Sequence, residues 1–272
     1  MAVSTYVNWQ RYLWEELMQL SQTRNNILAF ALLIALLGLC SRSEAQQTGE
    51  NTGTLEQSFF DAIKAGNSSR VAELLAARPY LIRATYRSGI SSILYAVYTD
   101  HRDIAELLVG TGVELNVFEA AATGKLDRVR RLVKKDPTLV RAWSSDGWTA
   151  LHLNFGHIDV AKFLLKAGAD VGVNSRNKLN ATPLQGAIVM NRIDLARLYI
   201  SHGADVNCRS ENGISPLGEA AANGFLDLAK LLLAHGANVN QRDDGGKTPL
   251  ALALEYKKPD LEKLIREHGG TL

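Results

Sequence analysis

A three-residue motif recurs in this sequence at a fixed interval of 33 residues, and no other feature constrains the fold as strongly. Glycine-containing phrases that begin at Gly203, Gly236 and Gly269 keep the same interval. Periods of roughly 20 to 50 residues are typical of proteins in which one small structural unit is stacked along a line. The motif series is Thr149-Ala150-Leu151, Thr182-Pro183-Leu184, Ser215-Pro216-Leu217 and Thr248-Pro249-Leu250.

Each unit predicts two helices joined by a turn. In the unit that begins with Ser215-Pro216-Leu217, Pro suits the first turn of a helix because its missing N–H would have no partner there. Asn223-Gly224 interrupts this helix, and residues 226–235 then have apolar side chains at helical spacing. Gly236 follows at a position where left-handed backbone ends a helix. A turn rich in Asp, Asn and Gly then leads to the next unit.

The phrases DGWTALHL, GADVN and GANVN resemble the consensus of the ankyrin repeat, whose unit is a β-turn followed by two antiparallel helices. The resemblance covers residues 55–272 and is most specific from Asp146 onward. It implies an all-α, ankyrin-type helix-turn-helix solenoid of about seven stacked repeats, with atypical first and last units as caps. We expect the units to begin near Leu55, Ser88, Asn116, Asp146, Leu179, Asn212 and Gly245.

The fourth unit departs from the pattern. Only His152 to Phe155 separate Leu151 from Gly156, which leaves the first helix two residues short, and the loop after Gly168 restores the count. Two residues are about half a helical turn, so the sequence predicts a shortened or irregular first helix and a local flaw in stacking. The shortening is either a tolerated deletion or a functional notch or hinge.

The N-terminal residues are predicted to lie outside the array. Ile27 to Cys40 form an apolar run of fourteen residues, shorter than the about 20 that a membrane-spanning helix needs. The run is typical of a secretory signal peptide, with a cleavage site after Ala45. We therefore predict a signal peptide at 1–45 and a flexible linker at 46–54.

Three alternatives stay open for this segment. The run could remain uncleaved as a marginal membrane anchor, or Cys40 could carry a lipid, although Leu39 is large for that signal. Translation could also start at Met18, which would give an ordinary basic stretch before the apolar run.

We expect no catalytic residue, metal or cofactor. His202, His235 and His268 recur every 33 residues, but stacked helices lie about 8–10 Å apart whereas zinc needs nitrogens at about 2 Å. We assign these histidines to helix ends, where imidazole suits the dipole. The net charge of +2, with bases and acids interspersed, argues against nucleic acid. Cys40 and Cys208 form no disulfide framework or metal pair.

The resemblance also implies roles for particular residues. In ankyrin repeats the Thr and His of the Thr-Ala-Leu-His phrase, here Thr149 and His152, tie the turns together. Partners bind a concave surface made of turn tips and inner helices. Trp148 could instead fill space beside the shortened helix. By position, the expected partner-binding residues are Ile90, Tyr98, Trp148, Val189, Met190, Arg209, Ile214, Asn223, Arg242, Lys247 and Tyr256.

The sequence therefore favours a non-enzymatic, monomeric binding module for a protein partner. We expect this module to be exported, of bacterial type, and periplasmic or secreted. The first alternative is a membrane-anchored tether with the same repeats. The second is an enzyme or a small-ligand protein that uses the irregular fourth unit as a pocket, which would require convergent polar groups beside Asn154.

Overall fold

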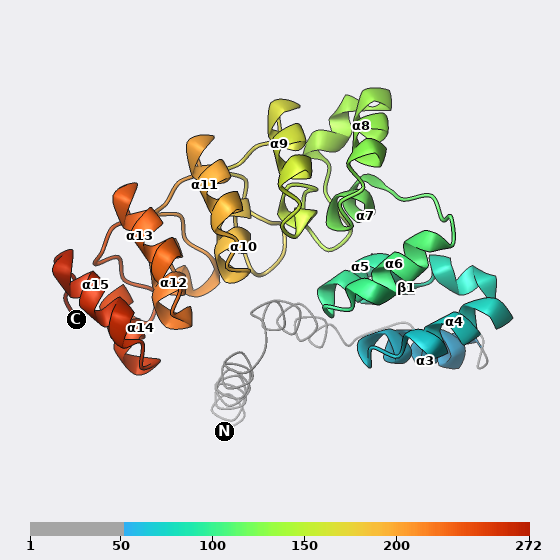
Figure 1. Ribbon diagram of the computed structural model, residues 1–272, viewed down its shortest axis with the longest axis horizontal. Coiled ribbons are helices and arrows are strands. Elements are labelled where there is room, and N and C mark those ends of the chain that lie inside the picture. The colour runs from blue at the N-terminus through green and yellow to red at the C-terminus, as the bar shows by residue number, and fades with distance from the viewer. Residues whose placement is uncertain (1–51) are drawn as a thin grey trace, which may run out of the picture. The chain divides into compact units, whose positions relative to one another are not determined.

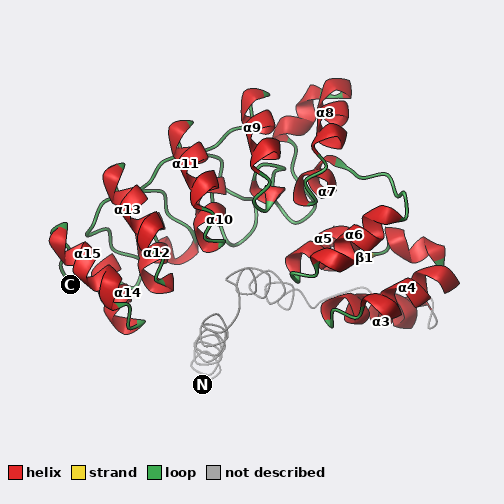
Figure 2. Ribbon diagram, in the orientation of Figure 1, coloured by secondary structure: helices red, strands yellow, loops and turns green. Residues whose placement is uncertain are grey.

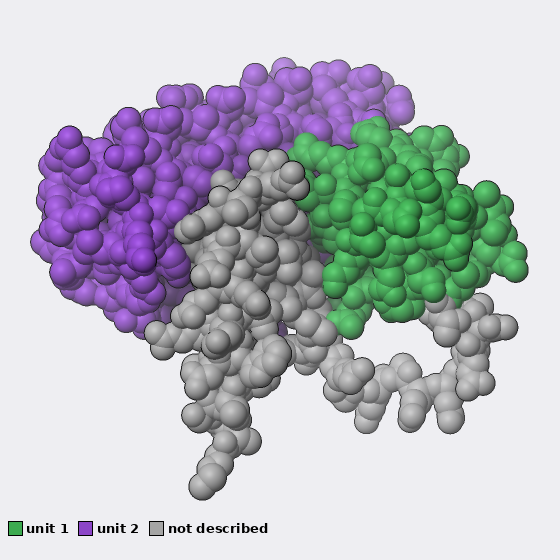
Figure 3. Space-filling model, turned by 60° about the horizontal axis from the view of Figure 1, so that its bottom comes forward, with its two compact units in different colours: residues 1–114 green, residues 115–272 purple. Residues whose placement is uncertain are grey.

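The computed structural model describes residues 52–272, so the predicted signal peptide and most of the predicted linker lie outside the described residues. Helices and the loops between them make up nearly all of the described chain (Figure 2). No helix in that part of the chain is long and apolar enough to cross a membrane. The chain divides into two compact units, residues 1–114 and Leu115–Leu272 (Figure 3).

The described part of the first unit contains two packed helix pairs, α3 with α4 and α5 with α6. A short antiparallel hairpin, in which Tyr86 pairs with Ile90, precedes α5. Phe60, Tyr86 and Tyr95 form an aromatic cluster with ring centroids 4.4–5.3 Å apart. The elements are α3 (Thr52–Lys64), α4 (Ser68–Ala77), η1 (Pro79–Arg83), β1 (Thr85–Tyr86), η2 (Arg87–Gly89), β2 (Ile90–Ser91), α5 (Ser92–Tyr98) and α6 (Arg102–Gly110).

In the second unit the helices form two rows (Figure 1). First helices follow one another in one row and second helices in the other, and each second helix packs on its own first helix. The first row is α7 (Val117–Ala122), η4 (His152–Asn154), α10 (Pro183–Val189), α12 (Pro216–Asn223) and α14 (Pro249–Glu255). The second row is α8 (Leu126–Lys135), α9 (Ile158–Lys166), α11 (Ile193–Ser201), α13 (Leu226–Ala234) and α15 (Pro259–Glu267); η3 (Pro137–Arg141) and η5 (Glu211–Gly213) lie in loops.

The recurring motif begins a helix in the last three units, as predicted. Thr182, Ser215 and Thr248 are N-caps whose side-chain oxygens accept a hydrogen bond from the backbone N–H three residues on, and Pro occupies the next position. Such caps satisfy donors that the helix itself leaves without partners. At the other end, Gly203, Gly236 and Gly269 have φ angles of 88°, 84° and 83°, in the left-handed region. The local elements were therefore correctly predicted; the number of about seven units stays a prediction.

The irregular first helix of the fourth unit is confirmed. The three-residue 3₁₀ helix η4 stands where the following units have a helix of seven or eight residues. Phe155 ends it in the left-handed region, with a φ of 43°, and Gly156 follows with a φ of 99°. The missing residues are thus absorbed within the first row, while α9 keeps its full nine residues.

Candidate partner-binding surface

The turns between successive units are joined to one another by backbone hydrogen bonds. Each bond runs from an N–H of one turn to a carbonyl of the preceding turn, so three turn-to-turn steps are fixed directly. This holds the turn tips in a row, because neither partner can shift without losing a bond. The bonds are Arg176 N–H to Gly147 O at 2.8 Å, Glu211 N–H to Leu179 O at 2.8 Å and Asp244 N–H to Asn212 O at 2.9 Å.

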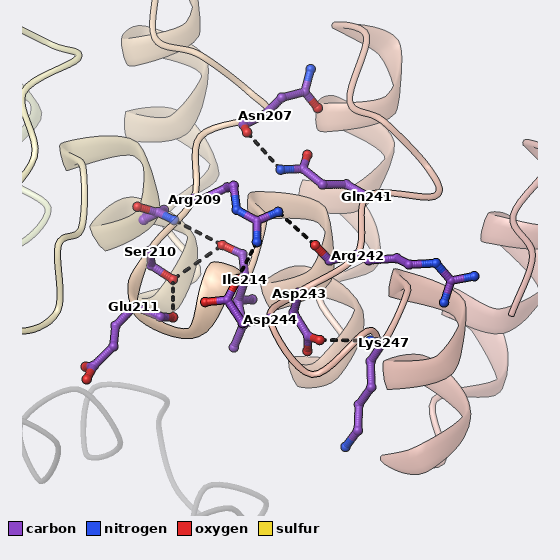
Figure 4. A network of polar contacts seen from close by, with 11 residues as sticks. Asn207, Arg209, Ser210, Glu211, Ile214, Gln241, Arg242, Asp243, Asp244 and Lys247 are labelled. Carbon is purple, nitrogen blue, oxygen red and sulfur yellow. Dashed lines mark hydrogen bonds and ion pairs between the residues drawn. The ribbon is translucent and has the colours of Figure 1, made fainter.

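Side chains reinforce the last of these steps (Figure 4). The Arg209 guanidinium donates to the Arg242 carbonyl at 2.8 Å and to the Asp244 carboxylate at 2.6 Å. Within the last unit, the Lys247 ammonium pairs with the Glu255 carboxylate of α14 at 2.5 Å. Because these groups are largely exposed, each pair adds only about 0–1 kcal/mol to stability. Their main effect is to orient charged side chains along the tips.

A buried histidine links the fourth and fifth units. His152 Nδ1 lies 2.8 Å from Thr149 Oγ1, and Nε2 lies 3.0 Å from the carbonyl oxygen of Ala181. A carbonyl only accepts, so Nε2 carries the proton and Nδ1 accepts from the Thr149 hydroxyl. Burial lowers the pKa of His152 to about 4, which keeps the ring neutral. The role that the resemblance implies for Thr149 and His152 is confirmed.

The polar groups beside Asn154 bind one another. Asn154 Nδ2 donates to the Leu151 carbonyl and to the Tyr199 hydroxyl, each at 2.5 Å, and that hydroxyl lies 3.3 Å from the same carbonyl. Asn154 and Tyr199 are both 1% exposed, and burial raises the pKa of the Tyr199 hydroxyl well above its usual range. The pair satisfies backbone and side-chain groups that the shortened helix would otherwise leave buried without partners.

A comparison with protein families decides what these stacked units are. The family described as ankyrin repeats (3 copies) matches residues 59–175, 117–210 and 184–271. The chain belongs to the ankyrin-repeat family. Ankyrin repeats are a protein-interaction module, and the family is generally non-enzymatic.

Three curated relatives share part of this ankyrin-repeat chain. It is 43% identical over 77 residues to serine/threonine-protein kinase VIK of Arabidopsis thaliana, covering 28% of this chain and 17% of the relative. It is 36% identical over 70 residues to the putative ankyrin repeat protein FPV024 of fowlpox virus, covering 25% of this chain and 12% of that relative. It is 26% identical over 114 residues to protein phosphatase 1 regulatory subunit 27 of Mus musculus, covering 41% of this chain and 58% of that relative. The chain therefore spans less than two thirds of each relative.

Seven of the predicted partner-binding residues reach the surface. Arg209, Arg242 and Lys247 are exposed on the turns. Val189, Ile214, Asn223 and Tyr256 are partly exposed and come from the first-helix row or a turn tip. Asn223 is also held by Glu219, since its amide donates to that residue's backbone and carboxylate oxygens at 2.9 Å. Their part in binding stays a prediction.

The expected exposure of the other four ankyrin-surface residues is wrong. Ile90, Tyr98, Trp148 and Met190 are only 9%, 2%, 3% and 7% exposed. Burial of apolar surface contributes about 25 cal/mol per Å² to the stability of the fold. Large apolar side chains are therefore buried wherever a neighbouring element can cover them. For Trp148 the neighbour is the His152 ring, with centroids 5.4 Å apart. This placement favours the packing interpretation of Trp148.

Sequence analysis missed an aromatic–cation pair at the turns. The guanidinium carbon of exposed Arg176 lies 4.3 Å from the ring centroid of half-buried Trp143. Their interval is 33 residues, so they occupy equivalent positions in adjacent repeats. Arg209 and Arg242 continue the series. The repeat interval itself was therefore the signal that could have found Arg176.

A hollow lies among the loops after the fourth and fifth units. It has a volume of about 420 Å³ and is lined by residues of the 171–174 and 204–209 loops together with Thr182. Cys208 lies there, 3.4 Å from the Thr182 hydroxyl, and burial raises the pKa of its thiol to about 11. A thiol that stays protonated at neutral pH is a poor nucleophile. Residues 52–272 contain no group of three or more potential metal ligands.

Proposed function

We propose that this chain is an exported ankyrin-repeat scaffold that binds a protein partner through its turn tips and first-helix row. The observation that carries the proposal is the row of bonded turns, which presents side chains from successive repeats at fixed spacing. The Arg209 guanidinium is held by Arg242 and Asp244, and the Arg242 guanidinium donates to the carbonyls of Gly246 and Leu272. Side chains that are already ordered in this way lose little conformational entropy on binding. Arg and Tyr are also enriched among residues that dominate interface energies.

Position-specific photocrosslinking tests the binding surface. A photoreactive phenylalanine analogue at Lys247 or Tyr256 is expected to give a discrete adduct with one protein in cells that express the chain. The same analogue at Lys230, an exposed position on α13, serves as the matched control and is expected to give none. Identical adducts at all three positions, or no adduct at Lys247 and Tyr256, would contradict the proposal.

The proposal also includes export, which depends on the other end of the chain. A signal peptide cleaved after Ala45 leaves Gln46 as the first residue, so mass spectrometry of the chain purified from a bacterial periplasmic fraction is expected to find that N-terminus. Recovery only in the membrane fraction, with residues 27–40 still attached, would replace it with the anchored tether. Recovery only in the cytoplasm would refute export in either form.

A further inference from the structure

The second-helix row carries a concentrated positive charge on two adjacent helices, α8 and α9. The exposed residues of α8 are Asp127, Arg130, Arg131, Lys134 and Lys135, which share one helix face because they are spaced by three or four residues. On α9 the exposed charged residues are Asp159, Lys162 and Lys166. We call Arg130, Arg131, Lys134, Lys135, Lys162 and Lys166 the α8–α9 basic face.

The two helices form one continuous surface. They pack against each other in the second row (Figure 1). The Arg130 guanidinium carbon lies 6.0 Å from the centroid of the Phe163 ring on α9, so a base of one helix reaches over the other. Within the described chain, the ion pair on this face joins Arg130 to Asp127 at 3.3 Å. The bases beyond that pair are exposed.

The repeat pattern explains only part of this charge. Every second helix from α8 onward has an Asp near its start and a base three residues later, such as Asp194 and Arg197 on α11 or Asp227 and Lys230 on α13. These pairs balance one another, and they account for Arg130 and Lys162. Arg131, Lys134, Lys135 and Lys166 remain in excess.

Arg131 departs furthest from what packing favours. The equivalent positions of the later second helices hold apolar residues that are half-buried or, at Leu231, buried, and Arg131 is instead exposed. The position of Lys134 is likewise uncharged on α11 and α13, so neither the repeat pattern nor the helix dipole requires a base at that position. The apolar equivalents of Arg131 are Phe163, Leu198, Leu231 and Leu264, and the uncharged equivalents of Lys134 are Ser201 and Ala234.

We propose that the α8–α9 basic face binds an acidic protein segment, separately from the turn-tip surface. Carboxylates pair with Arg in bidentate geometry and with Lys as a point charge. The ten-residue helix α8 is about 15 Å long. An extended acidic segment of about five residues would therefore match its length.

Other anionic partners fit the face less well. A helix that lies in a membrane surface inserts apolar side chains below the headgroups, but the large apolar residues that are exposed in the described chain are Tyr80, Leu254 and Leu272, none of them on α8 or α9. Duplex nucleic acid engages a larger protein surface, about 1,000 Å² or more. Here the face covers only two short helices, of ten and nine residues.

The test uses the full chain and a fluorescein-labelled hexaglutamate peptide, with binding followed by fluorescence anisotropy at low salt. Combining Arg131→Glu with Lys134→Glu is expected to weaken binding by about tenfold or more, because it reverses two charges at the centre of the face. The matched control combines Arg197→Glu with Lys230→Glu. It changes the net charge equally at exposed positions of α11 and α13 and is expected to weaken binding less than about threefold. Thermal melting checks that both variants stay folded.

Several results would overturn this assignment. Equal weakening in both double variants would show that net charge alone attracts the peptide. Absence of saturable binding would refute the site directly. Tighter binding to a short DNA duplex, or to vesicles of equimolar phosphatidylglycerol and phosphatidylcholine, lost in the α8 double variant, would assign the face to that partner instead.

Discussion

Replacing Trp148 with Ala is expected to lower the free energy of unfolding by about 3–5 kcal/mol, the usual range for truncating a buried aromatic residue. The Trp148 side chain is 3% exposed and packs against the His152 ring. Truncation leaves a cavity beside the shortened helix η4, where neighbouring side chains are already held by hydrogen bonds and cannot collapse freely. Urea unfolding followed by circular dichroism measures the change.

Trp143→Ala is the matched control, because it removes the same type of side chain five residues earlier in the same turn. Trp143 is half-buried and is covered on one face by the Arg176 guanidinium. A partly exposed cation–π contact contributes about 0.5–2 kcal/mol, so its loss should cost clearly less than the loss of Trp148. A Trp148→Ala variant no less stable than Trp143→Ala would contradict the packing role of Trp148 and would favour its role in partner binding.

The sequence predicted local structure well, because local structure depends on a few positions of fixed chemistry. Thr182 begins a helix since its hydroxyl caps the backbone, and Gly236 ends one since its φ of 84° suits glycine best. Both requirements repeat every 33 residues and can be read without knowing the fold. The sequence also shows that two residues are missing before Gly156, and this deficit predicted the shortened helix.

Exposure was harder to predict because it depends on the neighbouring element. Tyr98 lies at the end of α5 at a position where the family pattern allows variation, yet its side chain is 2% exposed. The α8–α9 basic face was missed for a related reason. Over the whole chain the numbers of basic and acidic residues nearly balance, so the composition does not reveal a local excess of positive charge. Arg131 and Lys166 indicate such an excess only once the structure shows that α8 and α9 pack side by side.

Lowering the pH is expected to destabilise the chain through His152. Its pKa falls from the ordinary 6.5 to about 4 in the folded chain because burial disfavours the charged ring. Below pH 6.5 the unfolded chain therefore binds a proton that the folded chain does not, and the free energy of unfolding falls as pH falls. The slope is about 1.4 kcal/mol per pH unit, with a total of about 3 kcal/mol by pH 4, below which both states are protonated.

His152→Gln isolates this contribution from that of the carboxylates. The next repeat shows that Gln suits the position, since Gln185 Nε2 donates to the Ile214 carbonyl at 3.3 Å just as His152 donates to Ala181. Urea unfolding at about pH 7.5 and about pH 5 should give similar stabilities at the higher pH and a wild-type deficit of about 2 kcal/mol at the lower. The same pH slope in both proteins would mean that the folded chain accepts a proton at His152 without cost, and the neutral bridge between Thr149 and Ala181 would then be the wrong description of this contact.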